Sequence, residues 1–136
     1  MHRRTKYVEI EDDNGTVLRY LHHENGDGLV EMTASVDPSA YVDRSAYVDS
    51  RARVSRGVRI GRGAWVDHDA TVRDDAHLSN TVHVGPGAVI GRAARLGARV
   101  KVGAGAHIAD GVTLPPDSVI PEGAVIGRTN ASRVAA

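Results

Sequence analysis

The sequence contains no cysteine and no phenylalanine, and it has one tryptophan and four tyrosines. Without cysteine the chain can form no disulfide bond, no thiolate nucleophile and no cysteine-ligated zinc site. With so few large aromatic side chains, it also lacks the material for an ordinary globular core. A chain of 136 residues has the length of one domain, so we expect a domain built around small aliphatic side chains.

An excess of charge and long apolar runs are missing as well. Seventeen basic and seventeen acidic residues give a formal net charge of zero, which argues against a nucleic acid as the main partner. No apolar run approaches the roughly 20 residues of a membrane span, and no secretory signal follows Met1. We therefore expect a cytoplasmic protein with no membrane and no nucleic-acid partner.

A strict period of six residues runs through most of the chain. From Val36 to Ile126 every sixth residue is valine, leucine or isoleucine, and four residues after each of them up to Ile120 comes a small side chain, mostly alanine. A helix is excluded, because six steps of about 100° leave the repeated residue far from its starting face. Short strands separated by corners, wound into a narrow prism, place both repeated positions inside.

This pattern resembles the left-handed parallel β-helix of hexapeptide-repeat proteins, an all-β fold of the acyltransferase-like superfamily. The resemblance covers roughly residues 34–128 and implies three hexads per coil, about five coils, and a homotrimer of parallel prisms. We expect residues 31–128 to form the β-helix and residues 129–136 to form a short tail, frayed or packed on a neighbouring subunit.

The first thirty residues lack the hexad period. Residues 6–10 and 16–21 alternate like strands around the turn Asp12-Asp13-Asn14-Gly15, which is typical of a β-hairpin. A β-helix exposes the edge of its first coil, and an open edge invites aggregation. We therefore expect residues 1–30 to be a hairpin and loop that cap the solenoid.

With three hexads per coil, residues eighteen apart become neighbours about 4.8 Å apart on one face. The outward positions then form three ladders: Tyr41, Arg59, His77, Arg95 and Thr113; Tyr47, Trp65, His83, Lys101 and Val119; and Arg53, Thr71, Val89, His107 and Val125. In the second ladder we expect Tyr47 and Trp65 to stack on each other. Exposed aromatic residues mark a contact surface, so we interpret this face as the homotrimer interface or as a platform for a ligand ring.

The residues with catalytic chemistry gather in one segment. Gly63-Ala64-Trp65-Val66-Asp67-His68-Asp69 is followed by Asp75-Ala76-His77-Leu78-Ser79. This segment resembles bacterial sugar acetyltransferases of the sialic acid and bacillosamine type. The resemblance implies that His68 is the general base, that Asp69 orients its imidazole, and that His77 lies near the acyl group of acetyl-CoA. An imidazole with an ordinary pKa of about 6.5 suits proton removal at neutral pH.

Several further residues are candidates for ligand binding. We expect Trp65, His77, Asn80, His83, Arg95 and Lys101 to contact a small molecule in the clefts between subunits. The backbone amides of Gly85, Gly87 and Gly91 could approach a thioester oxygen or a pyrophosphate. Arg92, Arg95, Arg99, Lys101 and Arg128 form either a phosphate-binding cluster or a mixed solvated surface.

A metal site is not expected. His77, His83 and His107 fall on three different ladders, so one chain cannot bring them to one ion at zinc-ligand distances. Two hypotheses for function remain. The first is a CoA-dependent acetyltransferase acting on a sugar- or nucleotide-like acceptor. The alternative, favoured by the unbroken hexads and by Asn80 in place of the proline usual in those enzymes, is a non-catalytic trimeric scaffold or a binder of a small phosphorylated ligand.

Overall fold

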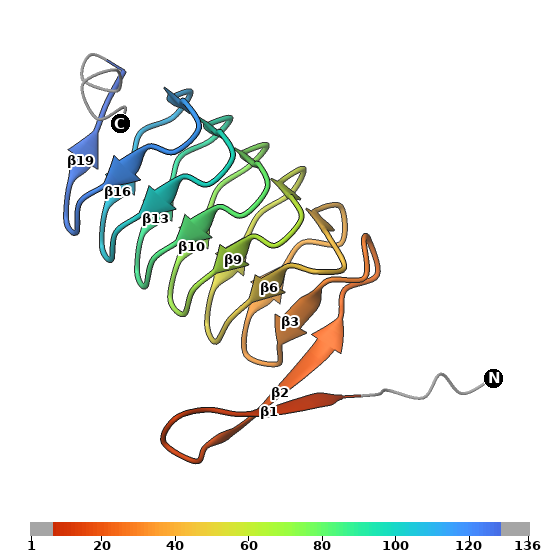
Figure 1. Cartoon of the computed structure of the whole chain (residues 1–136). Helices are drawn as coiled ribbons and strands as arrows, with labels where there is room; N and C mark the ends of the chain where they lie inside the picture. The colour runs from red at the N-terminus through yellow and green to blue at the C-terminus, as the bar shows by residue number, and fades with distance from the viewer. Residues whose placement is uncertain (1–6, 129–136) are drawn as a thin grey trace.

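The computed structural model describes residues 7–128 as a β-solenoid of about five coils, with no helix among these residues. A short β-hairpin precedes the coils and projects from their N-terminal end (Figure 1). The strands are β1 (Val8–Glu11), β2 (Val17–His22), β3 (Leu29–Glu31), β4 (Ser35–Val36), β5 (Tyr41–Val42), β6 (Tyr47–Val48), β7 (Arg53–Val54), β8 (Arg59–Ile60), β9 (Trp65–Val66), β10 (Thr71–Val72), β11 (His77–Leu78), β12 (His83–Val84), β13 (Val89–Ile90), β14 (Arg95–Leu96), β15 (Lys101–Val102), β16 (His107–Ile108), β17 (Thr113–Leu114), β18 (Val119–Ile120) and β19 (Val125–Ile126). This is the left-handed parallel β-helix that the hexads predict.

Three sheets form the three sides of the prism. We name each after a central outward residue: the Trp65 face is β1-β2-β3-β6-β9-β12-β15-β18, the Thr71 face is β4-β7-β10-β13-β16-β19, and the His77 face is β5-β8-β11-β14-β17. Within the coils every pairing is parallel and joins residues one coil apart, as His77 pairs with Arg59 and Arg95. The three predicted ladders are confirmed, so the spacing of three hexads per coil is correct.

The interior is a column of side chains from both repeated positions. At the first repeated position, the aliphatic residues from Val42 to Ile126 are at most 3% exposed, and at the second repeated position the alanines from Ala40 to Ala106 are fully buried. Small residues at the second position are needed because the short sides of the prism leave no room for three large side chains per layer. Burial of this column supplies the hydrophobic stabilisation that a core of aromatic residues provides elsewhere.

The corners of the prism depend on a left-handed backbone conformation. Every sixth residue from Arg51 to Gly123 has a positive φ, between 58° and 72°. Glycine, aspartate and asparagine accept this conformation most easily, yet Thr81 and Ala93 adopt it here as well. The corners therefore recur because the buried hexad demands them, even where the local residue disfavours the conformation.

The N-terminal hairpin extends one side of the prism. β1 pairs antiparallel with β2, β2 pairs antiparallel with β3, and β3 lies parallel to β6, so the hairpin continues the Trp65 face beyond the first coil (Figure 1). Asp12 stabilises the hairpin turn by accepting hydrogen bonds from the amides of Asn14 and Thr16. The expected C-terminal tail, residues 129–136, lies outside the described residues. Among residues 7–128, no helix is present that could cross a membrane.

Candidate active site

His68 lies at the corner that joins the Trp65 face to the Thr71 face. It follows β9 and precedes β10, in a turn where the amide of Ala70 donates to the carbonyl of Asp67 at 3.3 Å. The imidazole of His68 is about half exposed, with 49% of its side-chain surface accessible, whereas the side chain of Asp67 is 10% accessible. The corner therefore presents an open imidazole next to a nearly buried carboxylate.

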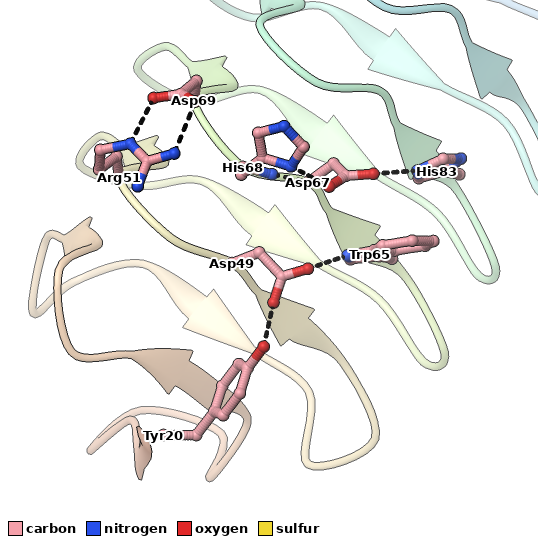
Figure 2. Close-up of polar contacts among 8 residues, drawn as sticks. All are labelled: Tyr20, Asp49, Arg51, Trp65, Asp67, His68, Asp69 and His83. Atoms are coloured by element: carbon pink, nitrogen blue, oxygen red, sulfur yellow. Dashed lines mark hydrogen bonds and ion pairs between the residues drawn. The ribbon is translucent and has the colours of Figure 1, made fainter. Parts of the chain in front are cut away.

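Asp67 binds two imidazoles. One of its oxygens, Oδ1, lies 2.9 Å from Nδ1 of His68 and accepts the backbone N–H of His68 at 2.8 Å, and Oδ2 lies 3.0 Å from Nε2 of His83. Figure 2 shows the carboxylate between the two rings. Because a carboxylate can only accept, both ring nitrogens donate to it. This fixes His68 as the tautomer with its proton on Nδ1 and leaves Nε2 free to take a proton.

The expectation that Asp69 orients His68 is corrected by this geometry. The carboxylate of Asp69 pairs with Arg51, at 2.9 Å from Nε and 3.1 Å from Nη2, and Figure 2 shows it directed toward Arg51. Hydrogen bonds from Arg51 lower the pKa of Asp69 below its usual value. The cause is the solenoid register: Arg51 lies one coil before Asp69, and the left-handed backbone of Asp69, with φ of 62°, aims its side chain away from His68.

A second carboxylate positions the tryptophan of the site. The indole N–H of Trp65 donates to Asp49, and so does the hydroxyl of Tyr20. Trp65 stacks on His83 with ring centroids 4.3 Å apart and an interplanar angle of 15°. Neither Asp49 nor Asp67 was expected from the sequence to position a ring. Each directly follows an inward aliphatic residue and contacts the ring sixteen positions later, and this shared offset was the available signal.

The predicted stacking of Tyr47 on Trp65 is wrong. Although the two residues are neighbours in register, the ring of Tyr47 meets Tyr20 edge-on, at 5.9 Å and 85°. Tyr20 belongs to the hairpin strand β2 and is 4% exposed. The hairpin thus contributes a buried side chain that contacts Tyr47 through its ring and Asp49 through its hydroxyl.

Tyr20 gives the folded protein a predicted dependence on alkaline pH. Burial, followed by its hydrogen bond to Asp49, raises the pKa of the Tyr20 phenol well above its usual value near 10. The Tyr20–Asp49 hydrogen bond should add about 1.5–3 kcal/mol to the free energy of unfolding, as is usual for a hydrogen bond to a charged group. This stabilisation should be complete below about pH 10 and decline as the pH rises further. In urea unfolding, Tyr20→Phe should be less stable than wild type at pH 8, and the difference should shrink at pH 11. The exposed Tyr7→Phe serves as control, and a difference that is constant with pH would contradict this assignment.

The remaining predicted ligand-binding residues divide between two faces. Lys101 is on β15 of the Trp65 face, next to His83 in register. His77 and Arg95 lie on the His77 face. Asn80 follows that face at the next corner, where its side-chain oxygen accepts the amide of Arg62 at 3.2 Å. One chain therefore gathers Trp65, His83 and Lys101 near His68, but it does not bring His77, Asn80 and Arg95 to them.

The expected backbone amide site is corrected. The amides of Gly85 and Gly91 donate to carbonyls of the next coil at 2.8 Å, and that of Gly87 donates to the carbonyl of His68 at 3.1 Å. A Cβ on Gly85 would come within 2.6 Å of the Val102 carbonyl oxygen, so neighbouring backbone fills this space. The three amides stabilise the coils and are not available to a thioester oxygen.

Most of the basic cluster is already paired. Arg99 binds Asp117 through two nitrogens, at 2.7 and 3.1 Å. Arg92 lies 3.7 Å from the Asp110 carboxylate, and Arg128 donates to the Asp110 carbonyl at 3.4 Å. This part of the cluster is a mixed surface. Residues 7–128 contain no group of three or more histidine, aspartate and glutamate side chains arranged to hold a metal ion.

An open polar groove of about 930 Å³ lies on the Thr71 face, next to the corner that carries His68. Its lining includes Asp69, Arg51, Ser55 and Thr71. Hydroxyl, guanidinium and carboxylate groups therefore surround a space large enough for a sugar-sized molecule.

Comparison with family models and with curated proteins gives no match. Among solved structures, the acetyltransferase domain of PglB from Neisseria gonorrhoeae matches with 26% identity and a TM-score of 0.52, covering 73% of this chain and 48% of that chain. The same domain in complex with acetyl coenzyme A matches at 25% identity, TM-score 0.46, over 71% and 55% of the two chains. PerB from Caulobacter crescentus, in complex with CoA and GDP-perosamine, matches at 27% identity, TM-score 0.47, over 71% and 49%.

This chain thus spans about half the length of the solved acetyltransferase chains that it matches. The similarity to the PglB domain covers nearly three quarters of the present chain. The resemblance to hexapeptide-repeat acyltransferases that the sequence indicates is therefore confirmed, and the chain is similar in fold to the acetyltransferase domain of PglB.

Proposed function

We propose that this protein is a homotrimeric acetyltransferase that moves an acetyl group from acetyl-CoA to an amine or hydroxyl of a small sugar- or nucleotide-like acceptor. The observation that supports it most directly is the contact between Asp67 and Nδ1 of His68 at 2.9 Å. A carboxylate on one imidazole nitrogen, with the other nitrogen open to solvent, is the arrangement of a general base. The fold similarity to an acetyltransferase domain supports the same reaction.

In this mechanism Nε2 of His68 removes the proton from the acceptor as its nitrogen or oxygen attacks the thioester carbonyl. Asp67 stabilises the imidazolium that forms, because its negative charge lies beside the protonated ring. When the tetrahedral intermediate collapses, the carbon–sulfur bond breaks and the imidazolium returns its proton to the departing CoA thiolate. We place the acceptor in the groove on the Thr71 face, where Ser55 and Thr71 offer hydroxyl contacts.

In this proposal a neighbouring subunit of the homotrimer completes the ligand-binding site. His77, Asn80 and Arg95 lie away from the His68 corner of their own chain, so their proposed ligand contacts require a neighbouring subunit. Trp65 is 41% exposed and Tyr47 is 39% exposed, and we assign their face to contact between subunits, with Trp65, His83 and Lys101 bordering the cleft. The expected location remains the cytoplasm.

Acetyl-CoA binding and transfer test the proposal. We expect calorimetry to show acetyl-CoA binding to wild type and to His68→Ala, and we expect release of CoA thiol with a panel of amino sugars by wild type only. Loss of the general base should reduce transfer by about 10²–10⁴-fold. The exposed His107→Ala, on the Thr71 face, is the matched control. Absence of acetyl-CoA binding would eliminate the transferase function. Binding without transfer by any variant would support the alternative of a non-catalytic binder.

A further inference from the structure

The His77 face carries basic side chains on three successive strands. Arg59 on β8, His77 on β11 and Arg95 on β14 are paired in register and point outward. Arg59 lies over the ring of Tyr41 on the preceding strand of this face, 5.0 Å from the ring centroid. Beyond Arg95 the ladder ends at Thr113. No member of this ladder is acidic. Within residues 7–128, neither Arg59 nor Arg95 forms an ion pair with a carboxylate.

This arrangement differs from that of the arginines at the corners. Arg51, Arg92 and Arg99 each lie beside an aspartate one coil further on, so their charge is balanced within the solenoid. On the His77 face, Arg59 and Arg95 lie two strands apart with the imidazole of His77 between them, and no carboxylate in the described part of the chain balances either charge. Burial, followed by the charges of Arg59 and Arg95, lowers the pKa of His77. A bound anion would balance the two arginines and favour the imidazolium form of His77.

Two shallow grooves lie on either side of His77. The first, of about 230 Å³, is lined by Tyr41, Arg59, His77, Ser79 and Asn80 among others, and the second, of about 260 Å³, by His77, Ser79, Arg95, Thr113 and Pro116 among others. His77 and Ser79 belong to both. The first groove also contains Asp43, whose carboxylate is engaged by Ser45 and by the Tyr41 hydroxyl. The first groove thus offers Arg59 and Arg62 and the second offers Arg95, and both share the His77 imidazole and the Ser79 hydroxyl.

We propose that the strip of Arg59, His77 and Arg95 binds the diphosphate group of a ligand. A guanidinium group binds two phosphate oxygens at once, because its N–H donors form a planar fork. Two linked phosphates present charge to both arginines across His77, whereas one phosphate reaches a single groove. Ser79 supplies a further hydroxyl donor. The strip lies on the side of the prism opposite the His68 corner of the same chain. It deepens the proposed function by naming the ligand chemistry at His77 and Arg95, and pyrophosphate binding can be measured without acetyl transfer, so the two proposals can fail separately.

Calorimetry with inorganic pyrophosphate at fixed ionic strength tests this site. We expect wild type to bind pyrophosphate more tightly than orthophosphate. Each loss of a charged donor should weaken binding about tenfold, so Arg59→Gln with Arg95→Gln should weaken it about a hundredfold. Arg73→Gln is the control, because Arg73 is an exposed corner arginine that lines neither of these grooves nor the groove on the Thr71 face. Unchanged pyrophosphate affinity in the double variant, or an equal loss in Arg73→Gln, would overturn the proposal.

A second measurement on the unaltered chain does not depend on the folding of any variant. Nuclear magnetic resonance titration should place the protonation midpoint of free His77 below the ordinary 6.5. Saturating pyrophosphate should move it upward, because a nearby negative charge favours the imidazolium. An unmoved His77 midpoint under saturation would also refute the site. ADP and dephospho-CoA, titrated into wild type and the double variant, then show whether the natural diphosphate belongs to a nucleotide or to the acetyl donor.

Discussion

Asp67→Asn is expected to reduce acetyl transfer by about 10²–10⁴-fold, whereas Asp69→Asn should retain most of the activity. Asparagine at position 67 presents an amide where the carboxylate accepts the Nδ1 proton of His68. The imidazole then loses both its fixed tautomer and the negative charge that stabilises its protonated form. Asp69 contacts Arg51 instead, and an exposed ion pair of this kind adds little to stability. Thiol release from acetyl-CoA, measured with the same acceptors for both variants, gives the comparison.

Resonances of the imidazole nitrogens separate a catalytic effect from a structural one. In wild type, ¹⁵N shifts should show His68 protonated at Nδ1 and His83 protonated at Nε2, because Asp67 accepts from both. Asp67→Asn should disturb both rings, while Asp69→Asn should leave them unchanged. Greater loss of activity in Asp69→Asn than in Asp67→Asn would return the orienting role to Asp69 and contradict the present assignment.

Ile90→Ala is expected to destabilise the fold by about 2–5 kcal/mol. Ile90 is fully buried in a coil that has neighbours on both sides, so the removed atoms leave a cavity that the rigid backbone cannot close. Val119→Ala is the control, because Val119 is 57% exposed and precedes the buried Ile120 on its own strand. Its change in unfolding free energy should lie within about 0.5 kcal/mol.

Two signals report this unfolding in urea. The fluorescence of Trp65, the only tryptophan, follows its own part of the solenoid, and circular dichroism follows all of it. Because each coil contacts only its neighbours, the two transitions should separate in Ile90→Ala if the coils beyond the cavity unfold first. Similar losses of stability in Ile90→Ala and Val119→Ala would contradict the buried column as the source of stability.

The sequence predicted the fold because the hexad specifies both spacing and direction. A valine, leucine or isoleucine at every sixth position can be buried only if the chain turns at fixed intervals, and that geometry determines the neighbours of each outward residue. His77 therefore had to lie between Arg59 and Arg95. The ladders follow from the period alone and need no knowledge of side-chain conformation.

The site was predicted less well because its contacts depend on corner geometry. Asp67 and Asp69 flank His68 symmetrically in the sequence, and only the backbone conformation at each position decides which carboxylate reaches the imidazole. Asp67 follows the buried Val66 and is itself held near the interior, whereas Asp69 has a positive φ and points toward the preceding coil. The same limit applies to the glycine amides, whose hydrogen-bond partners belong to the coils next to them.

The register between coils also restricts how the gene for such a protein can change. A deletion or insertion of one residue within the hexads would exchange buried and solvent-facing positions along the rest of the repeat. If it fell between Asp67 and His83, it would also separate these two side chains. Gain or loss of an entire coil preserves every downstream environment. Length variation in this architecture should therefore proceed by whole turns of the solenoid, or by excursions confined to a corner.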